Sequence, residues 1–201
     1  GFADWESLMP YGVGAFMLFG LGSLPAGRLG DLWGRRPMML VFFVGMGLSM
    51  LVIAVTHNAW ELAAALALMG LFSSIYHPVG IPMLVRGASR PGLAIGVNGL
   101  AGNLGVAFAA ITTGFLVKYA GWRAAFAVPG LFAIGCGIAF ARLAPRDAAP
   151  PAHGARTPRS EGARSLARVF AVMTIAAISG SLLFNFTTNG NGELLRERFR
   201  G

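Results

Sequence analysis

Residues 27–40 read Gly-Arg-Leu-Gly-Asp-Leu-Trp-Gly-Arg-Arg-Pro-Met-Met-Leu, a short charged segment between two long apolar runs. A helix needs about 20 apolar residues to cross the hydrocarbon core of a bilayer, and both flanking runs reach that length. Positively charged short loops orient a membrane protein, because they stay on the cytoplasmic side. The segment therefore predicts a tight basic turn at residues 27–37 that faces the cytoplasm and fixes the orientation of its neighbours.

The composition is that of a membrane protein. Of the 201 residues, 55% are hydrophobic and 12% are charged, which is about half the charged fraction of a soluble domain. The formal net charge of +8 does not indicate a nucleic-acid partner, because most basic residues lie in the short gaps between apolar runs. We expect an all-α membrane protein, a polytopic helical bundle whose surroundings are the lipid bilayer.

Several apolar segments are long enough to span the membrane. They cover residues 8–26, 38–56, 60–85, 92–117, 122–141 and 166–187. The gaps between them alternate between Arg-rich and Arg-poor, which predicts that the N-terminus and the C-terminal tail lie outside. Residues 144–164 are rich in Pro, Ala, Arg and Gly and have no apolar periodicity, so we expect a flexible linker there.

The residues of the basic segment suggest specific interactions. Gly27 and Gly34 permit backbone shapes or close approach that a Cβ would block. Asp31 can cap a helix or pair with an arginine. Arg35 and Arg36 can bind anionic lipid head groups or the carbonyl end of a helix. On these residues alone, a functional element and a plain topology-setting loop are equally supported.

The basic segment resembles the signature loop that joins the second and third helices of the major facilitator superfamily of secondary transporters. The resemblance is carried by Gly27, Leu29, Asp31, Gly34, Arg35 and Arg36. Two positions depart from the family pattern, since Gly30 stands where Ala or Ser is usual and Leu32 where a basic residue is usual. In the family this loop helps to lock the inside-closed state. The resemblance implies a conformational gating role for Gly27, Asp31, Gly34, Arg35 and Arg36.

The resemblance covers essentially the whole chain and implies an organisation. The predicted spans would be the family's helices two to seven, so the bundle is incomplete. Residues 1–143 would be the N-terminal helical half without its first helix, and residues 144–164 the central cytoplasmic linker. Residues 165–201 would be the first helix of the C-terminal half with an outer amphipathic tail. The expected partners then include the missing helices of the full-length transporter.

The run Tyr76-His77-Pro78 lies inside the apolar segment 60–85. His77 is the only ionisable residue deep within a predicted span, apart from the weak acid Tyr76, and imidazole gains and loses a proton near neutral pH. Pro78 lacks a backbone N–H, so we expect a kink that frees the carbonyl of Ser74, with nearby serine hydroxyls satisfying the break. A structural histidine and a proton- or substrate-handling histidine are equally supported.

The apolar segment 92–117 carries glycines at intervals of three or four, which should let a neighbouring helix approach closely. They are Gly92, Gly96, Gly99, Gly102 and Gly105. Asn98 and Asn103 add hydrogen-bonding groups to the same segment, and Asn185 lies near the outer end of the last predicted span. We treat Tyr76, His77 and these three asparagines as candidates for contact with protons or substrate.

Motifs of other function classes are missing from the sequence. It has no His-Glu-x-x-His, no Gly-x-Ser-x-Gly and only one cysteine, so we expect no enzyme activity, catalytic residue, metal or cofactor. A receptor or scaffold would share the helices but would not need the basic signature or the glycine-rich segment.

The resemblance implies a secondary active transporter of the bacterial inner membrane that works by alternating access. The Tyr-His-Pro run is similar to the fosmidomycin-resistance-like branch, which implies proton-coupled export of a small drug-like or amphipathic substrate. Many drug antiporters instead carry an Arg in this helix, and none occurs between Trp60 and Val85. An uptake carrier for a small metabolite stays an alternative.

Overall fold

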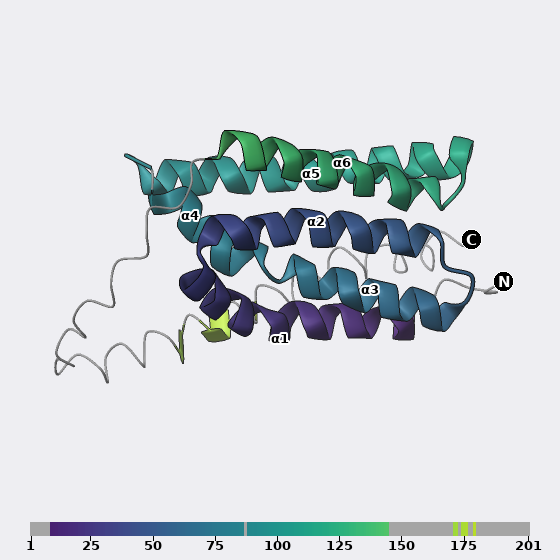
Figure 1. Cartoon of the computed structure of the whole chain (residues 1–201), viewed down its shortest axis with the longest axis horizontal. Helices are drawn as coiled ribbons and strands as arrows, with labels where there is room; N and C mark the ends of the chain where they lie inside the picture. Colours follow the sequence, from purple (N-terminus) through teal and green to yellow (C-terminus); the bar gives the residue numbers. More distant parts are fainter. Residues whose placement is uncertain (1–8, 87, 145–170, 173, 177–178, 180–201) are drawn as a thin grey trace, which may run out of the picture. The chain divides into compact units, whose positions relative to one another are not determined.

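The computed structural model describes residues 9–86, 88–144, 171–172, 174–176 and 179. The chain divides into two compact units, Gly1–Pro151 and Ala152–Gly201. In the described part of the first unit every regular element is a helix (Figure 1). The elements are α1 (Met9–Trp33), α2 (Arg35–Ala54), α3 (Ala59–Ser73), the π-helical segment η2 (Tyr76–Gly80), α4 (Ile81–Arg86), α5 (Pro91–Ala120) and α6 (Ala124–Leu143).

The described residues contain five helices long and apolar enough to cross a membrane, with α3, η2 and α4 forming one span. They confirm the first five predicted spans and the helical-bundle fold. The sixth predicted span, 166–187, lies mostly outside the described residues, as do nearly all of the linker and the C-terminal tail. The predicted division of the chain at residues 144–164 therefore stays a prediction.

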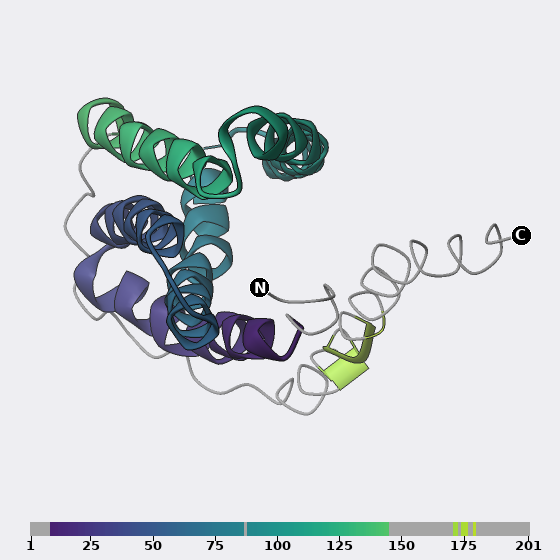
Figure 2. The same cartoon turned by 90° about the vertical axis from the view of Figure 1, so that its right-hand side faces the viewer.

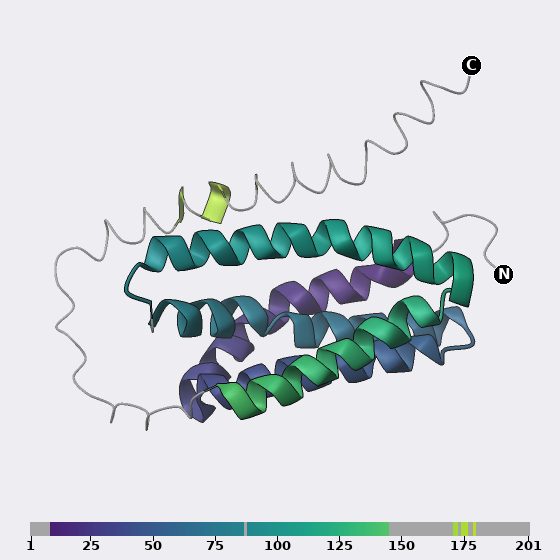
Figure 3. The same ribbon diagram turned by 90° about the horizontal axis from the view of Figure 1, so that it is seen from above.

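Successive spans run in opposite directions, side by side (Figures 1 and 3). We call the end of the bundle that holds Gly34 the inner end and the end that holds Thr56 the outer end, after the predicted orientation. Seen along the helices, α3 lies between α1 and α2, α6 lies against α2, and α5 lies at the edge (Figure 2). The most extensive contacts are those of α2 with α6, α1 with α3, and α2 with α3.

Glycines allow these helices to approach at backbone distance. A Cβ at Gly47 in α2 would lie 2.6 Å from the carbonyl oxygen of Gly130 in α6, and a Cβ at Gly130 would lie 2.9 Å from that of Gly47. A Cβ at Gly70 in α3 would overlap the backbone of Ala15 in α1. Small residues at helix crossings are typical of membrane bundles, where packing rather than the hydrophobic effect holds helices together.

The structure corrects the predicted turn at residues 27–37. α1 continues to Trp33 and α2 begins at Arg35, so the break is the single residue Gly34, whose φ of 99° is open to glycine and rarely to other residues. Gly27 and Gly30 belong to the helix, and their missing side chains make room for η2. A Cβ at Gly30 would lie 2.9 Å from a methyl group of Val79.

The glycine-rich face of α5 does not have the close neighbour that we expected. No described atom of another element lies within 4 Å of a Cβ built at Gly92, Gly96, Gly99, Gly102 or Gly105. No residue of α5 is buried against the other described elements. The prediction that a neighbour packs closely against these glycines is therefore wrong for the described part of the chain, because α5 lies at its edge.

A small core at the inner end positions the basic segment. It joins α1, α2 and the η2 region through buried side chains of Ala26, Met38, Met39, Ile75 and Val79. Because Met38 and Met39 lie near the start of α2, two and three residues after Arg36, the core packs this end of α2 against η2. The basic segment and the Tyr76–His77 region are thus held by the same packed cluster.

Candidate functional site

Asp31 and Arg35 form an ion pair across the break between α1 and α2. Arg35 Nη2 lies 3.3 Å from Asp31 Oδ1. The Asp31 side chain is 70% exposed and the Arg35 side chain 14% exposed, so the pair presents a carboxylate whose partner lies underneath it. Of the two roles expected for Asp31, the structure shows the pairing with an arginine, and no side chain caps the start of α2.

Arg36 binds the carbonyl end of a helix, which was one of the two roles predicted for it. Its Nε donates to the carbonyl of Ala144 at 3.2 Å, and its Nη2 donates to the carbonyl of Ala141. The last carbonyls of a helix have no partner inside the helix, and the negative end of the helix dipole favours a cation there. Arg36 therefore ties the first turn of α2 to the last turn of α6.

Tyr76 and Asn98 meet where η2 faces α5. The Tyr76 hydroxyl donates to Asn98 Oδ1 at 2.6 Å. His77 follows on η2 with an exposed side chain, and its ring makes an edge contact with Phe19 of α1 at 6.2 Å between centroids. The structure thus brings Asn98 to Tyr76, and the Tyr76 ring also contacts that of His77, the next residue. Asn103 lies exposed on α5 away from this pair, and Asn185 lies outside the described residues.

The predicted kink at Pro78 takes the form of the π-helical segment η2. We expected the hydroxyls of Ser73 and Ser74 to satisfy the freed carbonyl of Ser74. They donate instead to the carbonyls of Met69 and Leu71, one turn back along the same span. The carbonyl of Ser74 instead accepts a long hydrogen bond of 3.5 Å from Ser23 of α1. Short π-helical insertions occur often at functional sites, because they turn side chains out of the regular helical register.

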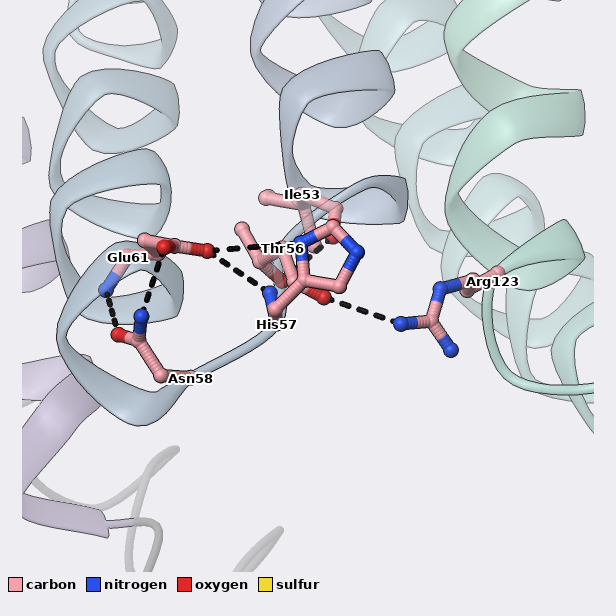
Figure 4. A network of polar contacts seen from close by, with 6 residues as sticks. All are labelled: Ile53, Thr56, His57, Asn58, Glu61 and Arg123. Carbon is pink, nitrogen blue, oxygen red and sulfur yellow. Dashed lines mark hydrogen bonds and ion pairs between the residues drawn. The ribbon is translucent and has the colours of Figure 1, made fainter.

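The outer end carries a polar network that the sequence analysis did not single out (Figure 4). Asn58 caps α3 by accepting from the backbone N–H of Glu61 at 2.9 Å, and Glu61 accepts from the backbone N–H of His57 at 2.8 Å. Arg123 reaches this turn from the start of α6 and donates to the carbonyl of Thr56 at 3.1 Å. The available signal for Arg123 was its position two residues after a glycine, as in Gly34-Arg35-Arg36.

An open hollow of about 300 Å³ lies at the outer end between α1 and α3, lined by Pro10, Tyr11, Gly14, Trp60 and Ala63. It is formed by residues near the starts of these two helices, whereas Tyr76 and His77 follow the end of α3. Within the described part of the chain, no group of three or more His, Cys, Asp or Glu side chains is placed to hold a metal ion.

Comparison with known proteins decides the family. The model of the Major Facilitator Superfamily matches residues 7–195. The chain belongs to this superfamily. Its members are multi-pass membrane transporters, and the five apolar helices of the described residues agree with such a fold.

Three of the relatives with curated names are efflux or resistance proteins. The chain is 31% identical over 138 residues to the puromycin resistance protein pur8 of Streptomyces alboniger (65% of this chain, 26% of that protein). It is 28% identical over 183 residues to the efflux pump terJ of Aspergillus terreus (88% and 33%). It is 30% identical over 145 residues to the tetracenomycin C resistance and export protein of Streptomyces glaucescens (68% and 26%).

The chain spans between a quarter and a third of the length of these relatives. No solved structure gives a significant match to it.

Proposed function

We propose that the protein containing this chain is a secondary active transporter of the bacterial inner membrane that exports a small drug-like or amphipathic molecule in exchange for protons. The superfamily supports transport, and the resistance and export proteins among the relatives support export of antibiotic-like compounds. The observation that carries the proposal is the placement of His77 beside the Tyr76–Asn98 hydrogen bond on a π-helical break in an otherwise apolar span.

The surroundings of His77 suit both a proton and an aromatic substrate. Imidazole is a common proton carrier in proteins, and the His77 ring stands next to Tyr76, which is hydrogen-bonded to Asn98. The rings of Phe19 and Tyr76 lie 6.2 and 5.5 Å from its ring. An ionisable group at membrane depth is costly to keep, which favours a functional role over a purely structural one. In this proposal His77 takes up the proton, and the adjacent aromatic rings contact the substrate.

The Asp31–Arg35 pair is proposed as the inner gate. Asp31 stands in the last turn of α1, where the helix dipole disfavours a carboxylate, and Arg35 offsets that cost. The exposed carboxylate is thus held in a defined position for a contact that depends on the state of the transporter. Gly27 and Gly34 support the gate, Gly27 by its close approach to Pro78 and Gly34 by its backbone conformation. Arg36 supports it by fixing the start of α2.

The test is transport by the full-length protein in proteoliposomes with an imposed pH gradient, using fluorescent hydrophobic amines as probe substrates. We expect His77→Gln to abolish gradient-driven accumulation and to retain gradient-independent exchange of the probe, because only the proton-carrying step is lost. The matched control is His57→Gln, the same change at an exposed histidine of the outer turn, which should transport normally.

Unchanged gradient-driven transport by the His77→Gln variant would contradict the role of His77. Accumulation in the direction opposite to export under the same gradient would instead support an uptake carrier for a small metabolite.

A further inference from the structure

The starts of α2 and α6 share one local design. Gly34 and Gly121 are the two glycines with positive φ in the described part of the chain, with φ and ψ of 99° and 153° and of 83° and 165°. Each is followed two positions later by an arginine, in Gly34-Arg35-Arg36 and Gly121-Trp122-Arg123. Both helices have 20 residues. A glycine of similar backbone conformation therefore precedes an arginine near the start of each of two equally long helices, with Arg36 as the second residue of α2 and Arg123 as the N-cap of α6.

The two arginines act reciprocally. Arg36 at the start of α2 donates to the carbonyls of Ala141 and Ala144 at the end of α6. Arg123 at the start of α6 donates to the carbonyl of Thr56, just past the end of α2, at 3.1 Å. Because α2 and α6 run antiparallel, the start of each helix lies near the other's carbonyl end, where the helix dipole favours a cation. Arg36 binds the end of α6, and Arg123 binds the turn that follows α2.

The crossing between these arginines is also tight. The backbones of Gly47 and Gly130 are in mutual contact, and a Cβ at Gly137 would lie 2.8 Å from that of Phe43. α2 and α6 share more contacts than any other pair of elements. A helix of 20 residues is about 30 Å long, so the two arginine contacts are separated by nearly the full length of a packed interface.

We propose that Arg123 is the outer counterpart of Arg36, and that these two Gly-x-Arg contacts hold α2 and α6 as one rigid pair while the transporter changes state. Arg123 is a positioning residue, which acts by fixing the end of α2. Its guanidinium lies 4.5 Å from the Trp122 ring, a cation–π contact that holds the side chain in place.

Substitution by lysine should affect the two arginines differently. Arg36 donates through two nitrogens to two carbonyls, a geometry that the single ammonium of lysine does not reproduce. Arg123 has one hydrogen bond to a carbonyl, which a lysine can replace. We expect Arg123→Lys to behave as the parent protein and Arg36→Lys to behave like Arg36→Gln.

The experiment measures distances between paired spin labels in the full-length protein in nanodiscs, at acidic and at neutral pH, with Cys136→Ser as background. Labels at Val55 and Val128 report on the outer end of the pair and labels at Val41 and Ile138 on the inner end. All four sites are exposed. Charge-matched controls are Lys118→Gln near the outer end and Arg142→Gln at the inner end, which remove a positive charge but neither contact.

In the parent protein both distances should be the same at the two pH values. Arg123→Gln should broaden only the outer distance distribution and Arg36→Gln only the inner one. Each should also lower Tm, Arg36→Gln by more than Arg123→Gln, because Arg36 loses hydrogen bonds to two carbonyls and Arg123 loses one to a single carbonyl. The losses should add in the double variant, because the sites are far apart.

Distances that change with pH in the parent protein would overturn the rigid pair. Equal broadening by Lys118→Gln and Arg123→Gln would overturn the assigned role of Arg123. These readouts do not measure transport, so they stand apart from the test of proton coupling.

Discussion

The ion pair of Asp31 and Arg35 at the inner end contributes little to stability but has a defined geometry. The pair is one helical turn apart and its carboxylate is largely exposed. Exposed pairs of this kind contribute about 0–1 kcal/mol to the free energy of unfolding. The pair therefore serves to position the Asp31 carboxylate, which agrees with a gating role rather than with a stabilising one.

Substitution of Asp31 tests this interpretation at the same scale. We expect Asp31→Asn to lower the rate of substrate efflux in the full-length protein several-fold and to change the Tm by less than about 2 °C, since the lost ion pair is exposed. Efflux from energised cells and thermal unfolding of the purified variant check the two expectations. A variant with normal efflux, or one that unfolds far below the parent protein, would contradict the gating role.

At the scale of elements, the span from Ala59 to Arg86 shows what sequence could and could not predict. Pro78 predicted a break, because a proline removes a backbone donor wherever it lies in a helix. The sequence could not predict that the break is π-helical, or that the Ser74 carbonyl is reached by Ser23 of α1. Such a partner depends on how two distant segments pack.

The glycines of the basic segment and of α5 also show what the sequence could not predict. Glycines at residues 27–34 suggested a turn, yet Gly27 and Gly30 serve close packing against η2, and Gly34 alone breaks the helix. The glycine spacing in α5 predicted a close neighbour, and the described residues contain none. The sequence shows where a glycine lies. Only the fold shows whether that glycine adopts a special backbone conformation or lets a neighbouring helix pack closely.

Helix approach at glycine gives a prediction for elements. Gly70→Ala should destabilise the protein by about 1–3 kcal/mol, because the added methyl group meets the backbone of Ala15 and α1 and α3 must separate. Gly20→Ala in α1 is the matched control, since nothing lies within 4 Å of its Cβ position. Thermal unfolding in the same detergent checks both variants. Equal stability of the two would contradict the observed α1–α3 contact.

At the scale of the whole molecule, the positions of the spans were predictable because long apolar segments are a strong signal. Five spans and the helical-bundle fold are confirmed. The candidate site was partly predictable. Tyr76, His77 and Asn98 meet, whereas the outer contact of Arg123 with Thr56 was missed, because the two residues are far apart in sequence. The gating and proton roles stay predictions.

In the proposed function, the basic segment faces the cytoplasm and changes its surroundings during proton-coupled transport. The most direct measurement is the rate at which a membrane-impermeant maleimide modifies Leu32→Cys in a Cys136→Ser background, in intact cells and in inside-out vesicles. Leu32 is exposed beside Asp31, so its replacement reports on the gate. We predict modification in inside-out vesicles alone, at a rate that changes when a pH gradient is imposed. Modification in intact cells, or a rate that ignores the gradient, would contradict the account.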